Sequence, residues 1–475
     1  MKKRIAVLGA GPAGLSLALG LLRKHGNQFE IVVLDGEDTV GGITASFKSH
    51  GLMFDYGSHR LHPAASPEVY NEISQMLGND LLKRPRNGRI RLLGRFVKFP
   101  LNPVDAAVHL PPQFMLGVLR DSLMKPFPRK KKAAETFATV LMEGLGKTIS
   151  RRFYFPYAEK LWGLPPEKLA AEQARRRVAT NSIAKMIKKG LSSLTGKAKA
   201  GGAFFYYPVN GFGAIAQGYS KALADLGGEQ FLGRKIEKIN IMEDRRFEIQ
   251  AAGAGGRRES YSYDFVFSTI PLDNLAKIIF PAIPAHIKSA ADRLHYRGML
   301  FHYLILKTGQ FTPFDAHYFP EKDFIFSRIS EPKNYYDSRL PEGITGICSE
   351  IPCTAGYELW KLPDKEITRR VVSDLNTCGL KVHVPVMDAF VKRIPAVYPV
   401  YDMTFAQNFE TVDRFFSALP NFVNLGRQAL FVHDNAHHTL EMGMRAVECL
   451  NGELKWDEEK WQGFRERFKR NVVVD

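Results

Sequence analysis

The sequence predicts an α/β fold, α+β overall, in which a domain built on a parallel sheet carries an inserted mixed domain of β-sheet and helices. Three observations support this prediction. The chain of 475 residues is too long for one compact core. Residues 4–34 alternate strand, helix and strand patterns, and strand-rich blocks return after long helical stretches. The order of these blocks indicates two domains assembled from separate segments of the chain.

The opening segment has the pattern of a βαβ unit. Residues 4–8 and 29–34 are apolar runs typical of buried parallel strands, and residues 13–24 between them have helical spacing. We predict further strands at residues 235–242, 247–252, 261–270, 299–306, 346–351 and 422–425, and further helices at residues 67–77, 135–145, 169–194, 365–375 and 439–451. The predicted first domain comprises residues 1–75, 200–290 and 405–475, and the second comprises residues 76–199 and 291–404.

The composition describes a basic globular protein. Lys plus Arg number 66 against 49 Asp plus Glu, a net charge of +17, which favours phosphorylated ligands or anionic lipid as partners. Part of the excess lies at residues 125–132, 175–177 and 185–199. No recognition module accompanies the charge, so we do not expect nucleic-acid binding. The alternative is that these residues form solvated linkers and helix faces.

The cysteine and hydropathy patterns indicate the cellular compartment and the possible contact with a membrane. Four cysteines without metal-ligand spacing favour a reducing cytoplasm. No stretch has the roughly 18 to 20 uninterrupted apolar residues of a transmembrane helix. Residues 104–127 are rich in Leu, Val, Phe and Pro, so they are the best candidate for peripheral contact with the inner face of a membrane. A helical cover over a substrate cleft is the alternative, and the oligomeric state is unknown.

A glycine-rich turn connects the first strand to the first helix. In the segment from Gly9 to Gly14, Gly9 permits a tight turn, Gly11 lets backbone amides approach a pyrophosphate, and Gly14 lets the helix pack on the strand. Asp35 ends the second strand, 21 residues after Gly14, where a carboxylate can hold a ribose hydroxyl. This context predicts a Rossmann-type dinucleotide site, which either NAD or FAD could occupy.

Two later segments favour FAD. Gly41 and Gly42 follow the acidic strand end, and the run from Gly51 to His59 contains Phe-Asp-Tyr-Gly-Ser-His. With these motifs the chain resembles the FAD superfamily that includes monoamine oxidase, protoporphyrinogen oxidase, phytoene desaturase and UDP-galactopyranose mutase. Ile43 departs from the arginine found there in many members. The resemblance implies an FAD-binding first domain and a substrate-binding second domain.

The resemblance also implies a set of cofactor contacts. The backbone of Ile236 would meet adenine, Gly426 and Arg427 would lie near the ribityl phosphate, and residues 442–444 would present helix-start amides to the flavin ring. The full set of expected FAD contacts is Gly9, Gly11, Pro12, Ala13, Gly14, Asp35, Gly41, Gly42, Thr44, Gly57, Ser58, His59, Ile236, Thr269, Gly426, Arg427, Met442, Gly443 and Met444.

Motifs in the middle of the chain narrow the resemblance. Residues 89–101, 155–163, 207–213 and 396–401 look like the branch between protoporphyrinogen oxidase and UDP-galactopyranose mutase. The leading hypothesis is an FAD-dependent oxidoreductase, an oxidase, dehydrogenase or desaturase, that takes hydride from a small or lipid-like substrate. The alternative is a non-redox, flavin-dependent sugar-nucleotide mutase, whose substrate is phosphorylated. A third, non-enzymatic alternative is a prenyl-protein-binding role like that of Rab GDP-dissociation inhibitors.

Three residues are candidates for catalysis. His59 would sit beside the flavin and orient the ring or shuttle a proton. Arg89 would share one strand face with Arg91 and Arg95 and bind a phosphate or carboxylate. Tyr398 is similar to a tyrosine that contacts substrate phosphate in the mutase branch, as is Tyr401. The alternatives are a hydrogen-bonded loop histidine, a solvated strand face and ordinary core tyrosines.

Two further clusters attract notice. Tyr157, Lys160 and Trp162 form either a ligand wall or core anchors. The histidines and aspartate of residues 433–438 lie in the turn before a helix, so a structural or flavin-site role is expected there and no metal site. Because no NAD(P)H domain is evident, we expect reducing equivalents to pass to oxygen, a quinone or a bound partner.

Overall fold

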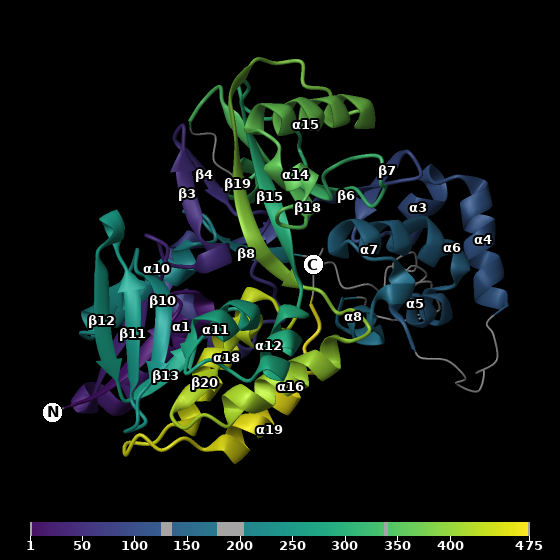
Figure 1. The fold of residues 1–475 in the computed structure, drawn as a ribbon. Coiled ribbons are helices and arrows are strands. Elements are labelled where there is room, and N and C mark those ends of the chain that lie inside the picture. Colours follow the sequence, from purple (N-terminus) through teal and green to yellow (C-terminus); the bar gives the residue numbers. More distant parts are fainter. Residues whose placement is uncertain (1, 125–134, 178–203, 337–340, 474–475) are drawn as a thin grey trace.

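The computed structural model describes residues 2–124, 135–177, 204–336 and 341–473, and strand counts refer to these ranges. Two lobes are visible in Figure 1. The first is built on a five-stranded sheet in which all neighbours are parallel, in the order β20 (Phe422–Asn424), β13 (Phe265–Ser268), β1 (Lys3–Leu8), β2 (Phe29–Leu34) and β9 (Glu229–Phe231). These strands come from three distant stretches of chain, each within a range predicted for the first domain.

The strands of this sheet alternate between two cores. Ile5 and Val7 of β1 face a cluster with the helices α1 (Pro12–His25), α10 (Ala214–Asp225) and α18 (Ala436–Cys449). Ala6 and Leu8 face the second cluster, which covers the opposite side. That side carries a four-stranded sheet of β12 (Arg258–Tyr263), β11 (Phe247–Ala252), β10 (Lys235–Ile241) and β14 (Ile279–Phe280), together with α11 (Leu272–Ile278), α12 (Ala285–Asp292) and α16 (Phe405–Ser417). Burial on both faces explains why β1 and β2 are continuously apolar.

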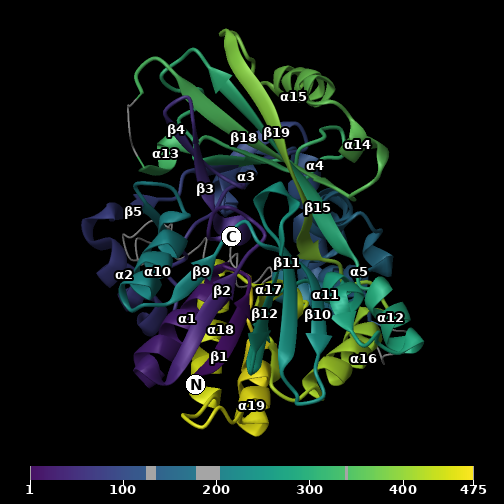
Figure 2. The ribbon, with the colours of Figure 1, turned by 60° about the vertical axis from the view of Figure 1, so that its left-hand side comes forward.

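The second lobe is built on a seven-stranded sheet. Its neighbours are antiparallel except for β16 and β6, in the order β19 (Val386–Pro399), β15 (Tyr296–Leu306), β18 (Thr345–Cys353), β17 (Arg328–Ser330), β16 (Ala316–Tyr318), β6 (Gly88–Leu92) and β7 (Arg95–Phe99). Leu300 and Leu304 of β15 pack toward α15 (Asp364–Cys378), and Phe301 and Tyr303 pack toward the hairpin of β3 (Ser46–Ser49) and β4 (Leu52–Asp55). Figure 2 shows this sheet above the first lobe.

Helices at the outer end of the second lobe pack on β6 and β7. They are α3 (Pro103–His109), α4 (Pro112–Leu123), α5 (Phe137–Leu145), α6 (Lys147–Ile149), α7 (Phe155–Trp162) and α8 (Ala171–Arg177). The remaining elements are α2 (Pro67–Leu77), the pair β5 (Leu81–Pro85) and β8 (Phe204–Pro208), α13 (Lys333–Tyr336), α14 (Glu358–Lys361), α17 (Gly426–Ala429) and α19 (Glu458–Phe468).

Most predicted elements occur where the patterns placed them, with four differences. The run at 261–270 is two strands, β12 and β13, which join different sheets. The helix predicted from residue 439 begins at Ala436, and the long, mostly half-buried strand β19 was not predicted. Of the helix predicted at 169–194, α8 covers Ala171–Arg177, and residues 178–194 lie outside the described residues, as do the basic residues 125–132 and 185–199.

Within the described residues, no helix has the length and apolar character needed to cross a bilayer. The same part of the chain contains no group of three or more His, Cys, Asp or Glu side chains arranged to hold a metal ion.

Candidate functional site

The glycine-rich turn has the close contacts that its sequence predicted. Gly9 has a φ of +116°, and a Cβ there would lie 2.0 Å from Oγ1 of Thr269, whose hydroxyl donates to the carbonyl of Leu8. A Cβ on Gly14 would lie 2.0 Å from the carbonyl oxygen of Gly9. A Cβ on Gly11 would meet nothing within 4 Å. The turn is therefore closed on the protein side and open above Gly11, at the start of α1.

Other segments singled out in the sequence analysis lie against this turn or next to it. Gly41 donates its amide to the carbonyl of Ala10 at 2.8 Å, and a Cβ on Gly42 would come within 3.9 Å of Cα of Gly11. The carboxylate of Asp35 accepts from the amides of Ala10 (2.6 Å) and Glu37 (2.9 Å), and burial raises its pKa. Ile236 follows Lys235, whose Cα lies beside Gly36 just after Asp35, and Gly426 packs against Ala13 and Thr269. The structure thus gathers one continuous surface from four separate stretches.

The loop of residues 57–59 joins this surface to the seven-stranded sheet. Gly57 has a φ of +90°, and a Cβ there would lie 2.9 Å from Oε1 of Glu350 on β18. The same oxygen accepts from the amide of Ser58 at 2.8 Å. His59 donates from Nε2 to the carbonyl of Ile43 at 2.8 Å, and its ring stacks on Phe212. Burial lowers the pKa of His59 to about 4, so the imidazole is neutral at neutral pH.

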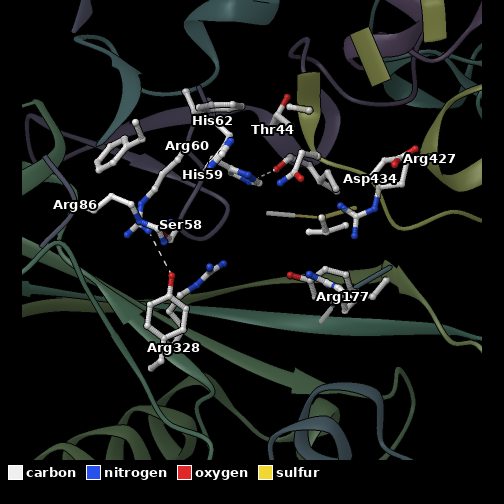
Figure 3. A pocket seen from close by; sticks show the side chains of 18 residues that line it. Thr44, Ser58, His59, Arg60, His62, Arg86, Arg177, Arg328, Arg427 and Asp434 are labelled. Atoms are coloured by element: carbon white, nitrogen blue, oxygen red, sulfur yellow. Dashed lines mark hydrogen bonds between the residues drawn. The ribbon is translucent and has the colours of Figure 1, made fainter. Parts of the chain in front are cut away.

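A cavity opens between the two lobes at this loop, and arginines dominate its wall. Figure 3 shows Arg60, Arg86 and Arg328 on one side and Arg177 and Arg427 on the other, with Thr44 and His59 between them. The other lining residues are Ile43, Ser58, His62, Phe205, Phe212, Tyr318, Tyr398, Asp434, Asn435, Ala436 and Val473. Asp434 is the single carboxylate among the described residues that line the cavity.

The two arginine groups differ in how their charge is balanced. Arg328 forms a two-pronged ion pair with Glu350, at 2.7 and 2.8 Å, and Arg60 lies 3.4 Å from Asp315. On the other side, the Cζ atoms of Arg177 and Arg427 lie 4.8 and 4.9 Å from the ring centroid of Tyr398. Burial, together with the nearby charge of Arg177, lowers the pKa of Arg427 to about 10. This second group has two cations against one nearby carboxylate, that of Asp434, in a buried place, which is the environment that an anionic ligand would stabilise.

The start of α18 lies at the cavity, but the residues expected there do not. Asn435 caps the helix in a reciprocal arrangement with His438, and Asp434, Asn435 and Ala436 line the cavity. The prediction that Met442, Gly443 and Met444 supply helix-start amides was wrong, because they lie about two turns inside the helix. Met442 is fully buried, and a Cβ on Gly443 would lie 2.0 Å from Oγ of Ser16 on α1. These residues hold α18 against α1.

The predicted arginine face on β6 was also wrong. The turn at Leu93 and Gly94 reverses the chain, so Arg95 pairs with Leu92 and lies on the face opposite Arg89 and Arg91. Arg89 lies outside the cavity, with its Cζ 3.9 Å from the ring centroid of Phe314. Arg91 pairs with Glu321. The structure therefore offers no support for Arg89 as a catalytic or phosphate-binding residue.

Other candidates are structural. Lys160 is buried and donates to the carbonyls of Phe319 and Phe326, and burial lowers its pKa to about 7. Trp162 is buried in the core of the helical region, and Tyr401 donates to the carbonyl of Phe431. Among the catalytic candidates, His59 and Tyr398 line the cavity.

Sequence reasoning missed most of the arginine wall. Arg60 had a signal, because it lies between the two histidines of the loop at residues 59–62. Arg328 had none, because β17 is a strand of three residues without a periodic pattern. Arg177 was counted only as part of a basic run.

Comparisons with known proteins fit this geometry. The family model of flavin containing amine oxidoreductases matches residues 12–403. Protoporphyrinogen oxidase 2 of Arabidopsis thaliana is 22% identical over 483 residues, covering 89% of each chain. Among solved structures, reduced UDP-galactopyranose mutase superposes with a TM-score of 0.81 at 19% identity, over 100% of this chain and 99% of that one.

A putrescine oxidase structure superposes less closely, with a TM-score of 0.63 at 13% identity, over 94% of this chain and 98% of that one. At these identities the structural likeness concerns the fold. The superfamily and fold class that the sequence motifs indicated are confirmed. The chain belongs to the family of flavin-containing amine oxidoreductases, a family of flavoenzymes.

Proposed function

We propose that this protein is an FAD-dependent oxidoreductase that acts on an organic substrate carrying a phosphate or another anionic group. The observation that carries the proposal is the buried, arginine-lined cavity beside the glycine turns. The family assignment supports a flavin cofactor. The positive charge of the cavity supports a substrate with an anionic group.

The residues around the turns fit a flavin dinucleotide. The open space above Gly11 and the amino terminus of α1 suit a diphosphate, because helix-start amides stabilise negative charge. The carboxylate of Asp35 has acceptor capacity beyond its two amide partners and would hold a ribose. Thr44, His59 and Ala436 line the cavity and would adjoin the flavin ring. A ligand that reaches from Asp35 to the cavity needs the adenosine half, which favours FAD over FMN.

The charge of the cavity argues for an anionic substrate. Five arginines line the cavity against one carboxylate among the described lining residues. Arg328 and Arg60 also have partners behind the wall, Glu350 and Asp315, and the balance is still positive, so a protonated amine such as putrescine would be repelled. Arg177 and Arg427 would bind the anionic group, since planar guanidinium groups bind phosphate or carboxylate oxygens in pairs. Tyr398 keeps both guanidinium groups in place by stacking.

The side chains that line the cavity would mainly orient the substrate, and we do not expect His59 to transfer a proton. A bound flavin would supply hydride transfer at the ring. His59 is neutral and donates Nε2–H to Ile43, so it holds the loop of residues 57–59 and is not a general acid at neutral pH. The aromatic rings of Phe205 and Phe212 line the same cavity and exclude water from the reacting carbon.

A second candidate is non-redox isomerisation of a nucleotide sugar. The observation that favours it is the division of the arginines into two groups on opposite sides of the cavity, which suits a ligand with charge at more than one point (Figure 3). Reduced UDP-galactopyranose mutase is the structural relative that motivates this chemistry. Such a reaction would need the reduced cofactor and consume no oxidant.

The test begins with the cofactor. Denaturing the purified protein should release FAD, identified by chromatography against FAD and FMN standards. Release of FMN, or failure to bind any flavin after reconstitution, would contradict the proposal.

The holoprotein should then be titrated without oxygen against phosphorylated isoprenoids, UDP-galactose and putrescine. A phosphorylated compound should perturb or bleach the flavin spectrum, and putrescine should leave it unchanged. Turnover of UDP-galactose by the reduced protein alone, with no oxidant consumed, would select the second candidate. Bleaching by putrescine but by no anionic compound would overturn the substrate class.

A further inference from the structure

Two helices at the outer end of the second lobe leave an apolar face uncovered. Residues Leu116, Leu119 and Leu123 of α4 recur at helical spacing and are 65%, 53% and 79% exposed. Val104 and Val108 of α3, the helix that precedes α4, are also exposed. We call these five residues the α3–α4 face. Figure 1 shows α3 and α4 at the edge of the molecule opposite the amino terminus.

The inward side of α4 explains why this exposure is unusual. Phe114, Met115 and Val118 pack against the core that includes β6, β7 and α5. The helix is therefore apolar on both sides, and only one side has a partner within the described chain. Isolated exposed leucines are ordinary on protein surfaces, but a contiguous strip usually marks a surface that is covered in function.

Basic side chains border the face. Arg120, Lys147, Arg151 and Arg152 line a groove of about 730 Å³ beside α4, together with Leu116. None of the described residues that line this groove is acidic. Asp121 is adjacent; its carboxylate is largely buried, accepts from the amide of Thr148 and lies 3.4 Å from the guanidinium group of Arg120, so Lys147, Arg151 and Arg152 provide most of the uncompensated charge. The net charge of the whole chain, +17, has the same sign.

We propose that the α3–α4 face is a docking site for an anionic membrane. The leucines and valines would enter the boundary between headgroups and acyl chains, and the four cations would contact lipid phosphates. An apolar strip beside a basic border is the arrangement that interfacial helices use, whereas a protein partner would need an acidic surface and a matching apolar one. This inference stands apart from the proposed reaction, because none of these residues lines the active-site cavity.

Co-sedimentation with vesicles tests the proposal on the flavin-loaded protein. Binding is expected to vesicles of phosphatidylcholine mixed with phosphatidylglycerol, not to phosphatidylcholine alone, and should weaken as salt is raised. Substituting Lys147→Gln, Arg151→Gln and Arg152→Gln should weaken binding about fivefold per removed cation. The triple variant Leu116→Gln, Leu119→Gln and Leu123→Gln should lose binding and keep its flavin.

The matched control removes exposed apolar residues elsewhere, through Leu226→Gln, Met242→Gln and Met403→Gln, which are 49%, 46% and 45% exposed in the parent. This control should sediment like the parent. Equal vesicle binding by the leucine variant and the parent would overturn the proposal, as would absence of parent binding to anionic vesicles at low salt.

A label provides a second readout. The four native cysteines are buried, so Leu119→Cys places one accessible thiol on the face. A polarity-sensitive dye there should shift to shorter emission wavelength with anionic vesicles, and the same dye at Leu226→Cys should not. An unchanged spectrum at position 119 would refute the docking site. So would a dimer of the parent that the leucine variant abolishes, since a second copy would then cover the face.

Discussion

The two sides of the candidate site are built in opposite ways. On one side, next to the cavity, main-chain groups of short glycine-containing turns at residues 9–14 and 41–44 form a surface whose shape follows from local sequence. On the other side, in the cavity itself, arginine side chains from residues 60 to 427 converge only in the folded protein. The glycine turns, which we propose hold the cofactor, are encoded locally, whereas the arginine wall, which we propose selects the substrate, depends on long-range packing.

Glu350 connects the two sides, so its removal should have the largest effect. Glu350→Gln leaves Arg328 without its ion-pair partner in a buried place and weakens the contact to Ser58, and we expect a loss of about 3 to 5 kcal/mol in unfolding free energy. Urea unfolding measures this. The control, Glu410→Gln, breaks an exposed pair with Arg414 and should cost less than about 1 kcal/mol. An equal loss of unfolding free energy in the two variants would show that the ion pair between Arg328 and Glu350 does not stabilise the fold.

Substitutions in the glycine turn separate folding from cofactor binding. Gly14→Ala places a methyl group against the backbone of Gly9 and should lower the unfolding free energy by about 3 kcal/mol. The flavin content of this variant should fall as well. Gly11→Ala meets no protein atom and should change stability by no more than about 1 kcal/mol, yet still reduce flavin content. Thermal unfolding and flavin absorbance per chain check both. Full flavin content in Gly11→Ala would contradict the assignment of the diphosphate to this turn.

On the arginine side, Arg427→Met should reduce ligand affinity without reducing stability. Affinity for inorganic diphosphate should fall about tenfold to hundredfold, because charged hydrogen bonds are lost. Stability of the ligand-free protein should hold or rise, because a buried cation beside Arg177 is removed. Calorimetric titration and urea unfolding test the two effects. Arg414→Met, on the exposed surface of α16, is the control, and unchanged affinity in Arg427→Met would remove this residue from the anion site.

Acid should lower the free energy of unfolding through buried histidines. Burial lowers the pKa of His59, His302 and His317 to about 4, against an ordinary value of 6.5. Between these values the unfolded chain binds more protons, so unfolding free energy falls as pH falls, by up to about 1.4 kcal/mol per pH unit for each histidine. Asp55 opposes this below pH 6, because burial raises its pKa to about 6 and the folded state then binds the extra proton.

The histidine contribution can be isolated by substitution. His302→Gln should reduce the pH slope of unfolding free energy between pH 6 and 5 by about 1.4 kcal/mol per unit. The exposed His286→Gln should leave the slope unchanged. Urea unfolding at both pH values measures it, and an unaltered slope in His302→Gln would show that His302 does not titrate between the two states.

The smallest effect is expected at Arg89. Because this residue stacks on Phe314 outside the cavity, Arg89→Met should leave diphosphate affinity unchanged and alter stability by less than about 1 kcal/mol. The same calorimetric titration decides. A tenfold loss of affinity would restore the phosphate-binding role that the strand pattern suggested.

The sequence predicted those parts of the site that depend on neighbouring residues. Gly9, Gly14 and Asp35 were found because turn geometry and strand ends leave a local pattern. The start of α18 was predicted three residues too late, at residue 439. Asn435 and His438 cap each other at the true start, and polar residues before an apolar run have the sequence pattern of a turn. Arg95 was assigned to the wrong face because a hairpin at Leu93 interrupts the alternation.

By itself, the sequence determined a parallel sheet with a tight glycine turn at its first strand, since these rest on backbone conformation and apolar periodicity within short stretches. Only the tertiary structure decided the charge and shape of the cavity. Arg60, Arg328 and Arg427 lie about a hundred or more residues apart in the chain, and no periodic pattern in the sequence predicts that they meet. Their proximity depends on the packing of the two lobes and, for Arg328, on its ion pair with Glu350. These are interactions between distant segments, so the sequence of one segment alone does not predict them.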